Sequence, residues 1–241
     1  MNTTINPANP VPQPPPLDPP LPENADLRTL LDALLRRPQA LVLHLFTHGR
    51  GALARFSLIV VVSFLLFGAV LGYFAKHDQL WAAPLKLVAG IFISGAICFP
   101  SLYIFTTLAG ARTHAPQLAA CLAGALALAG LLLLGLSPAV WIFAESTDSF
   151  GFVGALAVGS WIIAAIFAFR FLGVAVAAGG GTQRGPLIFW GVVFLLVTLQ
   201  MTTSLRPILG RSPVLLSQEK KFFLQHWSEY FAEALPPAAE E

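Results

Sequence analysis

The sequence predicts an all-α membrane protein: a polytopic transmembrane helix bundle with about five spans and an amphipathic interfacial helix at each end. Three observations predict this class. The 241 residues are 56% hydrophobic and 11% charged, whereas soluble domains carry about 25% charged residues. The hydrophobic residues lie in long runs of about 20, the length that crosses a ~30 Å hydrocarbon core as a helix. The runs also lack the alternation of barrel strands, which favours helices that satisfy their own backbone groups.

The first 23 residues are predicted to be a proline-rich, disordered arm. Nine prolines fall between positions 7 and 22. Proline fixes φ and removes a backbone donor, so the arm should be extended and polyproline-like. It is interpreted either as a flexible spacer or as a ligand for an SH3-like or WW-like partner, and folding should not depend on it.

Residues 24–55 form a predicted amphipathic juxtamembrane segment. Asn24 can cap a helix that Pro38 ends, and this helix is too short and too charged to span. It should lie in the membrane interface or pack on the bundle. One helical face is formed by five leucines: Leu27, Leu30, Leu31, Leu34 and Leu35.

A predicted transmembrane domain occupies residues 56–205. Its connections are short and leave no room for a soluble catalytic domain. Within the spans the only charged residue is Lys86, which sits near an end and can reach the interface. The predicted spans are Phe56–Ala75, Leu85–Ala109, Gln117–Leu136, Phe150–Phe169 and Leu187–Leu205.

Residues 206–241 form a predicted amphipathic tail. Ser217 can cap its helix, and Trp227 and Tyr230 share one face with other aromatic residues. Such residues suit the headgroup zone, so the helix is interpreted as interfacial, with a partner-binding helix as the alternative.

The distribution of Lys and Arg predicts a cytoplasmic N-terminus. With that orientation the inner flanks hold eight Lys and Arg and the outer flanks six. The loop 137–149 contains acidic residues and no Lys or Arg, which favours the outside. The expected location is a bacterial inner membrane, with a eukaryotic endomembrane as the alternative. The net charge of +2 is too small to indicate nucleic acid.

Two polar groups inside the spans are the candidate sites. Pro100 removes a helix hydrogen bond and should free the carbonyl of Ala96. The site is either a hinge for a lipid or solute or a structural kink. Gln200 is costly in lipid unless paired, so its surroundings are a solute site or a helix–helix contact. The candidate residues are Pro100, Ser101, Tyr103, Thr106, Gln200, Thr202 and Thr203.

The residues do not indicate catalysis, a metal or a cofactor. His44 and His48 are four apart and could begin a metal site, but zinc needs a third and a fourth ligand. The spans lack the His/Asp/Glu cluster or Ser/His pair typical of membrane-embedded enzymes. Cys98 and Cys121 are interpreted as small apolar packing residues.

The five-span layout, the basic stretch RRPQAL and the short loop LAGARTHAPQL resemble the Yip1-like family of five-helix membrane proteins. The resemblance covers about residues 34–205. It implies a cytoplasmic N-terminal arm, a Gly-containing loop after the second span, and a role in membrane organisation or trafficking. The long amphipathic tail and the CFPSLY stretch depart from the family layout.

The predicted function is that of a non-enzymatic scaffold, adaptor or complex subunit. Its expected partners are the lipid bilayer and other membrane proteins. The alternative is a channel or carrier for a neutral or lipid-like solute, which rests on Pro100 and the hydroxyl groups near it.

Overall fold

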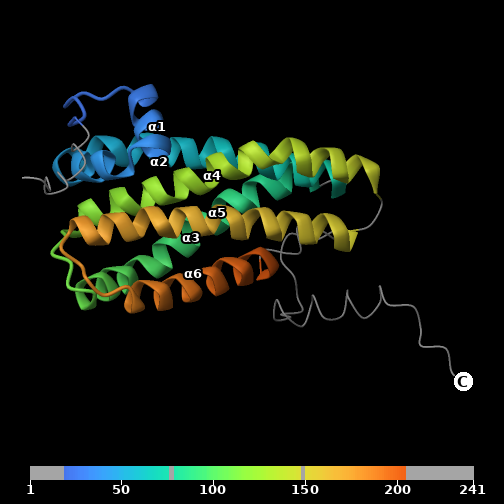
Figure 1. The fold of residues 1–241 in the computed structure, drawn as a ribbon. Coiled ribbons are helices and arrows are strands. Elements are labelled where there is room, and N and C mark those ends of the chain that lie inside the picture. Colours follow the sequence, from blue (N-terminus) through green and yellow to red (C-terminus); the bar gives the residue numbers. More distant parts are fainter. Residues whose placement is uncertain (1–18, 76–78, 148–149, 205–241) are drawn as a thin grey trace, which may run out of the picture.

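A computed structural model describes residues 19–75, 79–147 and 150–204 (Figure 1). Every regular element in this part of the chain is a helix, so the predicted all-α class is confirmed for it. The predicted arm, apart from its last residues, and the predicted amphipathic tail lie outside the described residues. The helices are α1 (Leu27–Arg36), α2 (Pro38–Ala75), α3 (Gln79–Leu108), α4 (Ala115–Ser146), α5 (Phe150–Ala178) and α6 (Gly185–Ser204).

Four of the described helices are long and apolar enough to cross a membrane, which fits the predicted integral membrane protein. Helix α6 adds a shorter apolar run, Gly185–Met201. The four long apolar segments are Gly51–Tyr73, Ala83–Leu108, Ala115–Ser146 and Phe152–Ala178.

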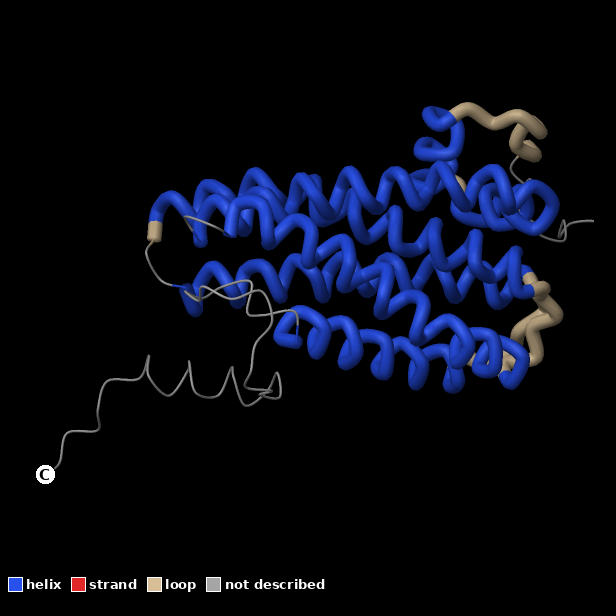
Figure 2. Tube along the Cα trace, turned by 180° about the vertical axis from the view of Figure 1, so that it is seen from behind, coloured by secondary structure: helices blue, strands red, loops and turns tan. Residues whose placement is uncertain are grey.

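The long helices run back and forth beside one another, and α1 crosses the bundle at one end (Figures 1 and 2). Helices α2 and α4 form the centre, α3 packs on α2, and α5 packs on α4. A glycine allows the central contact: a Cβ added at Gly130 would lie 3.0 Å from the Cβ of Ser63 and 3.2 Å from the ring of Phe64. Small residues permit such close helix approach inside membranes.

Three helices continue past the apolar runs that were predicted as spans, into residues that were predicted to be connections. The predicted first span began at Phe56, but α2 begins at Pro38 and bends at His48, where φ is −122° and ψ is 26°. Helix α4 continues through Pro138 to Ser146, and α5 continues through Arg170 to Ala178. Hydropathy identifies the part of a helix that suits lipid. Helical backbone hydrogen bonds do not depend on hydropathy and can continue beyond that part.

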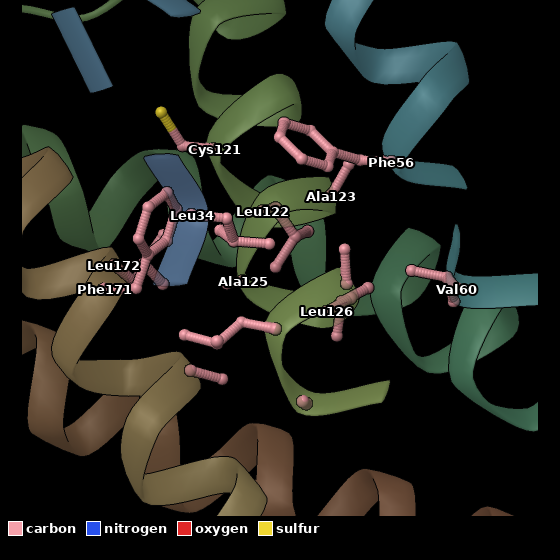
Figure 3. Packing of buried hydrophobic residues seen from close by; sticks show 14 of the residues in the cluster. Leu34, Phe56, Val60, Cys121, Leu122, Ala123, Ala125, Leu126, Phe171 and Leu172 are labelled. Carbon is pink, nitrogen blue, oxygen red and sulfur yellow. The ribbon is translucent and has the colours of Figure 1, made fainter. Parts of the chain in front are cut away.

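Helix α1 packs on the bundle, which was one of its two predicted positions. Asp26, rather than Asn24, is its N-cap residue. Its inner face buries Leu30, Ala33 and Leu34. Leu34 belongs to the same buried cluster as side chains of α4 and α5 (Figure 3). The guanidinium of Arg55 on α2 donates a hydrogen bond to the carbonyl of Ala25, just before α1.

Candidate functional site at the loop end of the bundle

Two connections between helices lie against each other at one end of the bundle, which we call the loop end. They are residues 109–114, between α3 and α4, and residues 179–184, between α5 and α6. Gly110 and Gly180 both have φ of +92°. This left-handed conformation suits glycine, which ends each helix with the same pair of backbone bonds. These bonds are Gly110 N to Thr107 O (2.9 Å), Ala111 N to Thr106 O (3.1 Å), Gly180 N to Ala177 O (3.0 Å) and Gly181 N to Val176 O (2.9 Å).

The two turns also bond to each other reciprocally. The amide of Arg112 donates to the carbonyl of Gly179 (2.8 Å), and the amide of Thr182 donates to the carbonyl of Ala109 (3.0 Å). Both donors and both acceptors are 70 positions apart, since 182 − 112 and 179 − 109 each equal 70. The two turns therefore form equivalent, reciprocal backbone bonds at an offset of 70 residues, which we interpret as an internal repeat.

The repeat extends into the helices that enter the turns. Residues 83–100 of α3 can be compared with residues 153–170 of α5, which lie 70 positions later. Each pair of positions has the same burial class, with one exception: Ile91 is buried, whereas Trp161 is half-buried. Pro100 thus corresponds to Arg170, and both are exposed. The sequence reasoning missed this repeat. Its visible signal was Gly110 and Gly180, each followed six residues later by proline.

Two arginines lie at the same level of the bundle. A Cβ added at Gly124 on α4 would lie 3.2 Å from the ring of Phe171 and 3.7 Å from the ring of Phe56. Because these rings meet at one level of α4, the residues that precede them, Arg170 on α5 and Arg55 on α2, lie near that level too. We call this the arginine level.

Exposed aromatic side chains lie near the end of the bundle opposite the loop end, which we call the far end. Tyr73, Trp81 and Trp141 are 55%, 79% and 51% exposed near the far ends of α2, α3 and α4. Tyr73 is 18 residues beyond Arg55, which is about 27 Å along a helix with a rise of ~1.5 Å per residue. This separation is close to the ~30 Å thickness of the hydrocarbon core of a bilayer. Exposed Trp and Tyr at such a distance are typical of a membrane–water interface.

The loop end carries a net positive charge. Asp32 pairs with two arginines, Arg36 at 3.1 Å and Arg37 at 3.5 Å. At the far end, the charged side chains that the structure describes are Lys86 and Glu145, which cancel. Seven described arginines against three acids give the loop end a balance of +4: Arg28, Arg36, Arg37, Arg55, Arg112, Arg170 and Arg184, with Glu23, Asp26 and Asp32.

The polar residues predicted around Pro100 do not share one face. Tyr103 is exposed, Ser101 is half-buried and Thr106 is fully buried. The hydroxyl of Ser101 donates to the carbonyl of Cys98 (2.8 Å), and the hydroxyl of Thr106 donates to the carbonyl of Tyr103 (2.9 Å). The hydroxyls therefore bond within their own helix.

The sequence reasoning missed a side-chain hydrogen bond that joins α3 to α6 near this proline. The indole N–H of Trp190 donates to the carbonyl of Cys98 over 3.0 Å, and the whole residue is buried. The carbonyl that receives a bond from another helix is therefore that of Cys98, whereas the expected one was that of Ala96. Trp190 also stacks on Phe194, with ring centroids 5.1 Å apart.

The second predicted polar group lies far from the first. Helices α3 and α6 are antiparallel, and Trp190 lies opposite Cys98. Gln200 lies ten residues after Trp190 on α6, and Pro100 lies two residues after Cys98 on α3. Because the two helices are antiparallel, these offsets point in opposite directions and add up to about 18 Å along the bundle at a rise of ~1.5 Å per residue. The side chains of Thr202 and Thr203 lie outside the described set. Pro100 and Gln200 therefore lie at different levels of the bundle.

A small apolar cavity lies between α4, α5 and α6. Its volume is about 20 Å³, and Leu126, Trp161 and Phe169 are among the residues that line it. It has room for about one water-sized sphere, and an apolar wall of this kind stays dry. We interpret the cavity as a packing gap in the core.

Beside the bend in α2, His44 and His48 lie together, with stacked rings whose centroids are 5.0 Å apart. Burial, and then the charges of His48 and Arg55, lower the pKa of His44. The side-chain amide of Gln117 on α4 meets the bend, because its nitrogen donates to the carbonyl of Phe46 (2.8 Å). Within the described ranges no three His, Cys, Asp or Glu residues are placed to hold a metal ion.

The chain matches no family model, and no curated protein or solved structure is significantly similar to it.

Proposed function

We propose that this chain is a non-enzymatic multi-pass membrane protein that acts as a scaffold, adaptor or complex subunit in membrane organisation or trafficking. The supporting observation is how the hydroxyl groups of the long helices are used. In a path for a polar solute, hydroxyls would point into a shared passage. Here several hydroxyls donate instead to carbonyls of their own helices, as in Ser137 to Leu134 (2.7 Å), Ser160 to Leu156 (2.8 Å) and Thr198 to Phe194 (2.8 Å).

We include α6 as a fifth span. It has 20 residues and runs antiparallel beside α3. Its start is held at the loop end by the turn that bonds to residues 109–112. Five crossings place the two ends of the chain on opposite sides of the membrane.

The charge balance supports the orientation. The positive-inside rule assigns the more basic side to the cytoplasm, and the loop end has a balance of +4 among the described side chains. The N-terminus is then cytoplasmic and the C-terminus is outside, in a bacterial inner membrane or, as the alternative, a eukaryotic endomembrane. The Yip1-like resemblance belongs to the same proposal, which it supports through layout alone.

The alternative, a channel or carrier for a neutral or lipid-like solute, is less well supported. It would require the polar groups of α3 and α6 to line one passage. The groups lie about 18 Å apart along the bundle, and the cavity of about 20 Å³ is lined by apolar residues.

Two experiments test this proposal. Purification in a mild detergent should recover another membrane protein in a fixed ratio, and proteoliposomes with the purified chain should show no solute flux. Flux together with the absence of a partner would overturn the scaffold role. For topology, a cysteine at the exposed Gln183 should be labelled only from the cytoplasmic side, and one at the exposed Ser146 only from outside. The control is a chain in which the buried Cys98 and Cys121 are alanine.

A further inference from the structure

Arg170 is a charged residue within an apolar helix. It lies in the segment Phe152–Ala178, which is long and apolar enough to cross a membrane. Its side chain is exposed, and no hydrogen bond or ion pair joins its guanidinium to the residues that the structure describes. A cation in such a segment indicates a functional role, and its partner must be sought outside the bundle.

An apolar strip continues from Arg170 toward the middle of the bilayer. Ile163, Ile166 and Phe167 precede Arg170 by seven, four and three residues, so they share its helical face. All three are exposed. The strip extends for about 10 Å from Arg170 at a rise of ~1.5 Å per residue. This face therefore combines a cation with an apolar surface suited to an acyl chain.

The level of Arg170 matches the position of lipid phosphates. The arginine level and the exposed aromatics at the far end are about 27 Å apart, so the arginine level lies at a boundary of the hydrocarbon core. Phosphate groups of the surrounding lipids lie just beyond this boundary. An arginine guanidinium binds phosphate oxygens in pairs, with charge-assisted hydrogen bonds.

We propose that Arg170 binds the phosphate of an anionic phospholipid in the leaflet at the loop end, with an acyl chain lying along Ile163, Ile166 and Phe167. The positive balance of this end favours a headgroup with a net negative charge over one with its own ammonium group. The proposal requires that α5 cross the membrane and does not depend on the scaffold role.

The internal repeat provides a matched face that lacks the cation. Pro100 occupies on α3 the position of Arg170 on α5, above the exposed Ile93, Ala96 and Ile97. The two faces have the same pattern of exposure and differ in charge at this position. An anionic lipid should therefore prefer the α5 face.

The test is native mass spectrometry of the full chain in detergent with equal amounts of phosphatidylglycerol and phosphatidylcholine. The wild type should retain phosphatidylglycerol in preference. Arg170→Gln should lower that retention about tenfold, which corresponds to ~1.4 kcal/mol. Arg170→Lys should keep part of it, because lysine retains the charge but not the paired geometry. Unchanged thermal unfolding in the absence of added lipid would show that the variants are folded.

The matched controls are Arg112→Gln and Arg184→Gln, which remove the same charge from the turns. Each should change retention by less than about twofold. A similar loss in all three glutamine variants would reduce the effect to net charge and overturn the site, and so would unchanged retention in Arg170→Gln. Displacement of the lipid by millimolar glycerol phosphate would assign the site to a soluble anion and overturn the lipid assignment.

Discussion

Replacement of the glycines in the paired turns gives the sharpest test of the fold. Gly110 and Gly180 have φ of +92°, a region in which a residue with a Cβ costs about 1–2 kcal/mol. There is room for the added methyl group at both positions. A Cβ added at Gly110 would lie 3.9 Å from its nearest neighbour, the carbonyl oxygen of Gly180, and a Cβ added at Gly180 would lie 4.0 Å from the carbonyl oxygen of Gly110. Gly110→Ala and Gly180→Ala should therefore lose stability for the same conformational reason and by similar amounts.

The expected size can be converted into a melting temperature. For a chain of this length, 1 kcal/mol corresponds to roughly 2–4 °C, so each variant should melt roughly 2–8 °C lower in detergent, as followed by helical circular dichroism. Because the turns share hydrogen bonds, the double variant should lose less than the sum of the two single losses.

Two other glycines are the controls. A Cβ added at Gly135 or Gly159, both inside helices, would meet nothing within 4 Å. Alanine there should leave stability unchanged or raise it by up to ~1 kcal/mol, since alanine favours the helix. Equal losses in turn and control variants would refute the conformational argument. A loss at only one of the two turns would refute their equivalence.

Three other perturbations give distinct outcomes. Trp190→Phe keeps the apolar contacts but removes the donor to α3, so unfolding should become easier by about 0.5–1.5 kcal/mol, measured by thermal unfolding in detergent. The pKa of His44 is lowered below 6.5 by burial and by the charges of His48 and Arg55; its contribution to stability is complete above pH 6.5 and is lost as the pH falls through the lowered value. Melting temperatures should therefore begin to drop as the pH falls below 6.5, and His44→Gln should reduce the drop; an equal drop in both proteins would exclude His44 as the cause. Pro100→Ala restores a helix donor at an exposed position, so it should keep or raise stability. If the folded variant loses the cellular phenotype of the wild type, Pro100 is a hinge or a binding site rather than a structural kink.

The sequence predicted the parts of the fold that depend on local pattern. Proline after a charged turn placed the boundary between α1 and α2 correctly, because the break is a property of the residue itself. The end of α5 was missed, because Arg170 interrupts the apolar run without interrupting the helix. A long arginine side chain leaves the helical backbone bonds intact, because it can extend its charged end away from the helix into a polar environment.

The candidate site was only partly predictable for a different reason. The sequence identified polar residues in apolar helices, but it did not show which group each hydroxyl would bond. Ser101 and Thr106 bond to carbonyls three residues earlier, a local choice that competes with any shared polar site. The bond from Trp190 to Cys98 joins residues 92 positions apart, and no local pattern contains that information.

The paired turns explain why α6 packs on α3 rather than on its sequence neighbour α5. The helix that follows each turn packs on the helix that precedes the other turn: α4 packs on α5, and α6 packs on α3. Helix α6 is then attached to α3 at two levels, through the amide of Thr182 at the turn and through the indole of Trp190 below it. A movement of α6 away from α3 would have to break both bonds and would leave the turn that positions α4 without its partner. A movement of α6 away from α3 is therefore coupled to the loop end of the bundle.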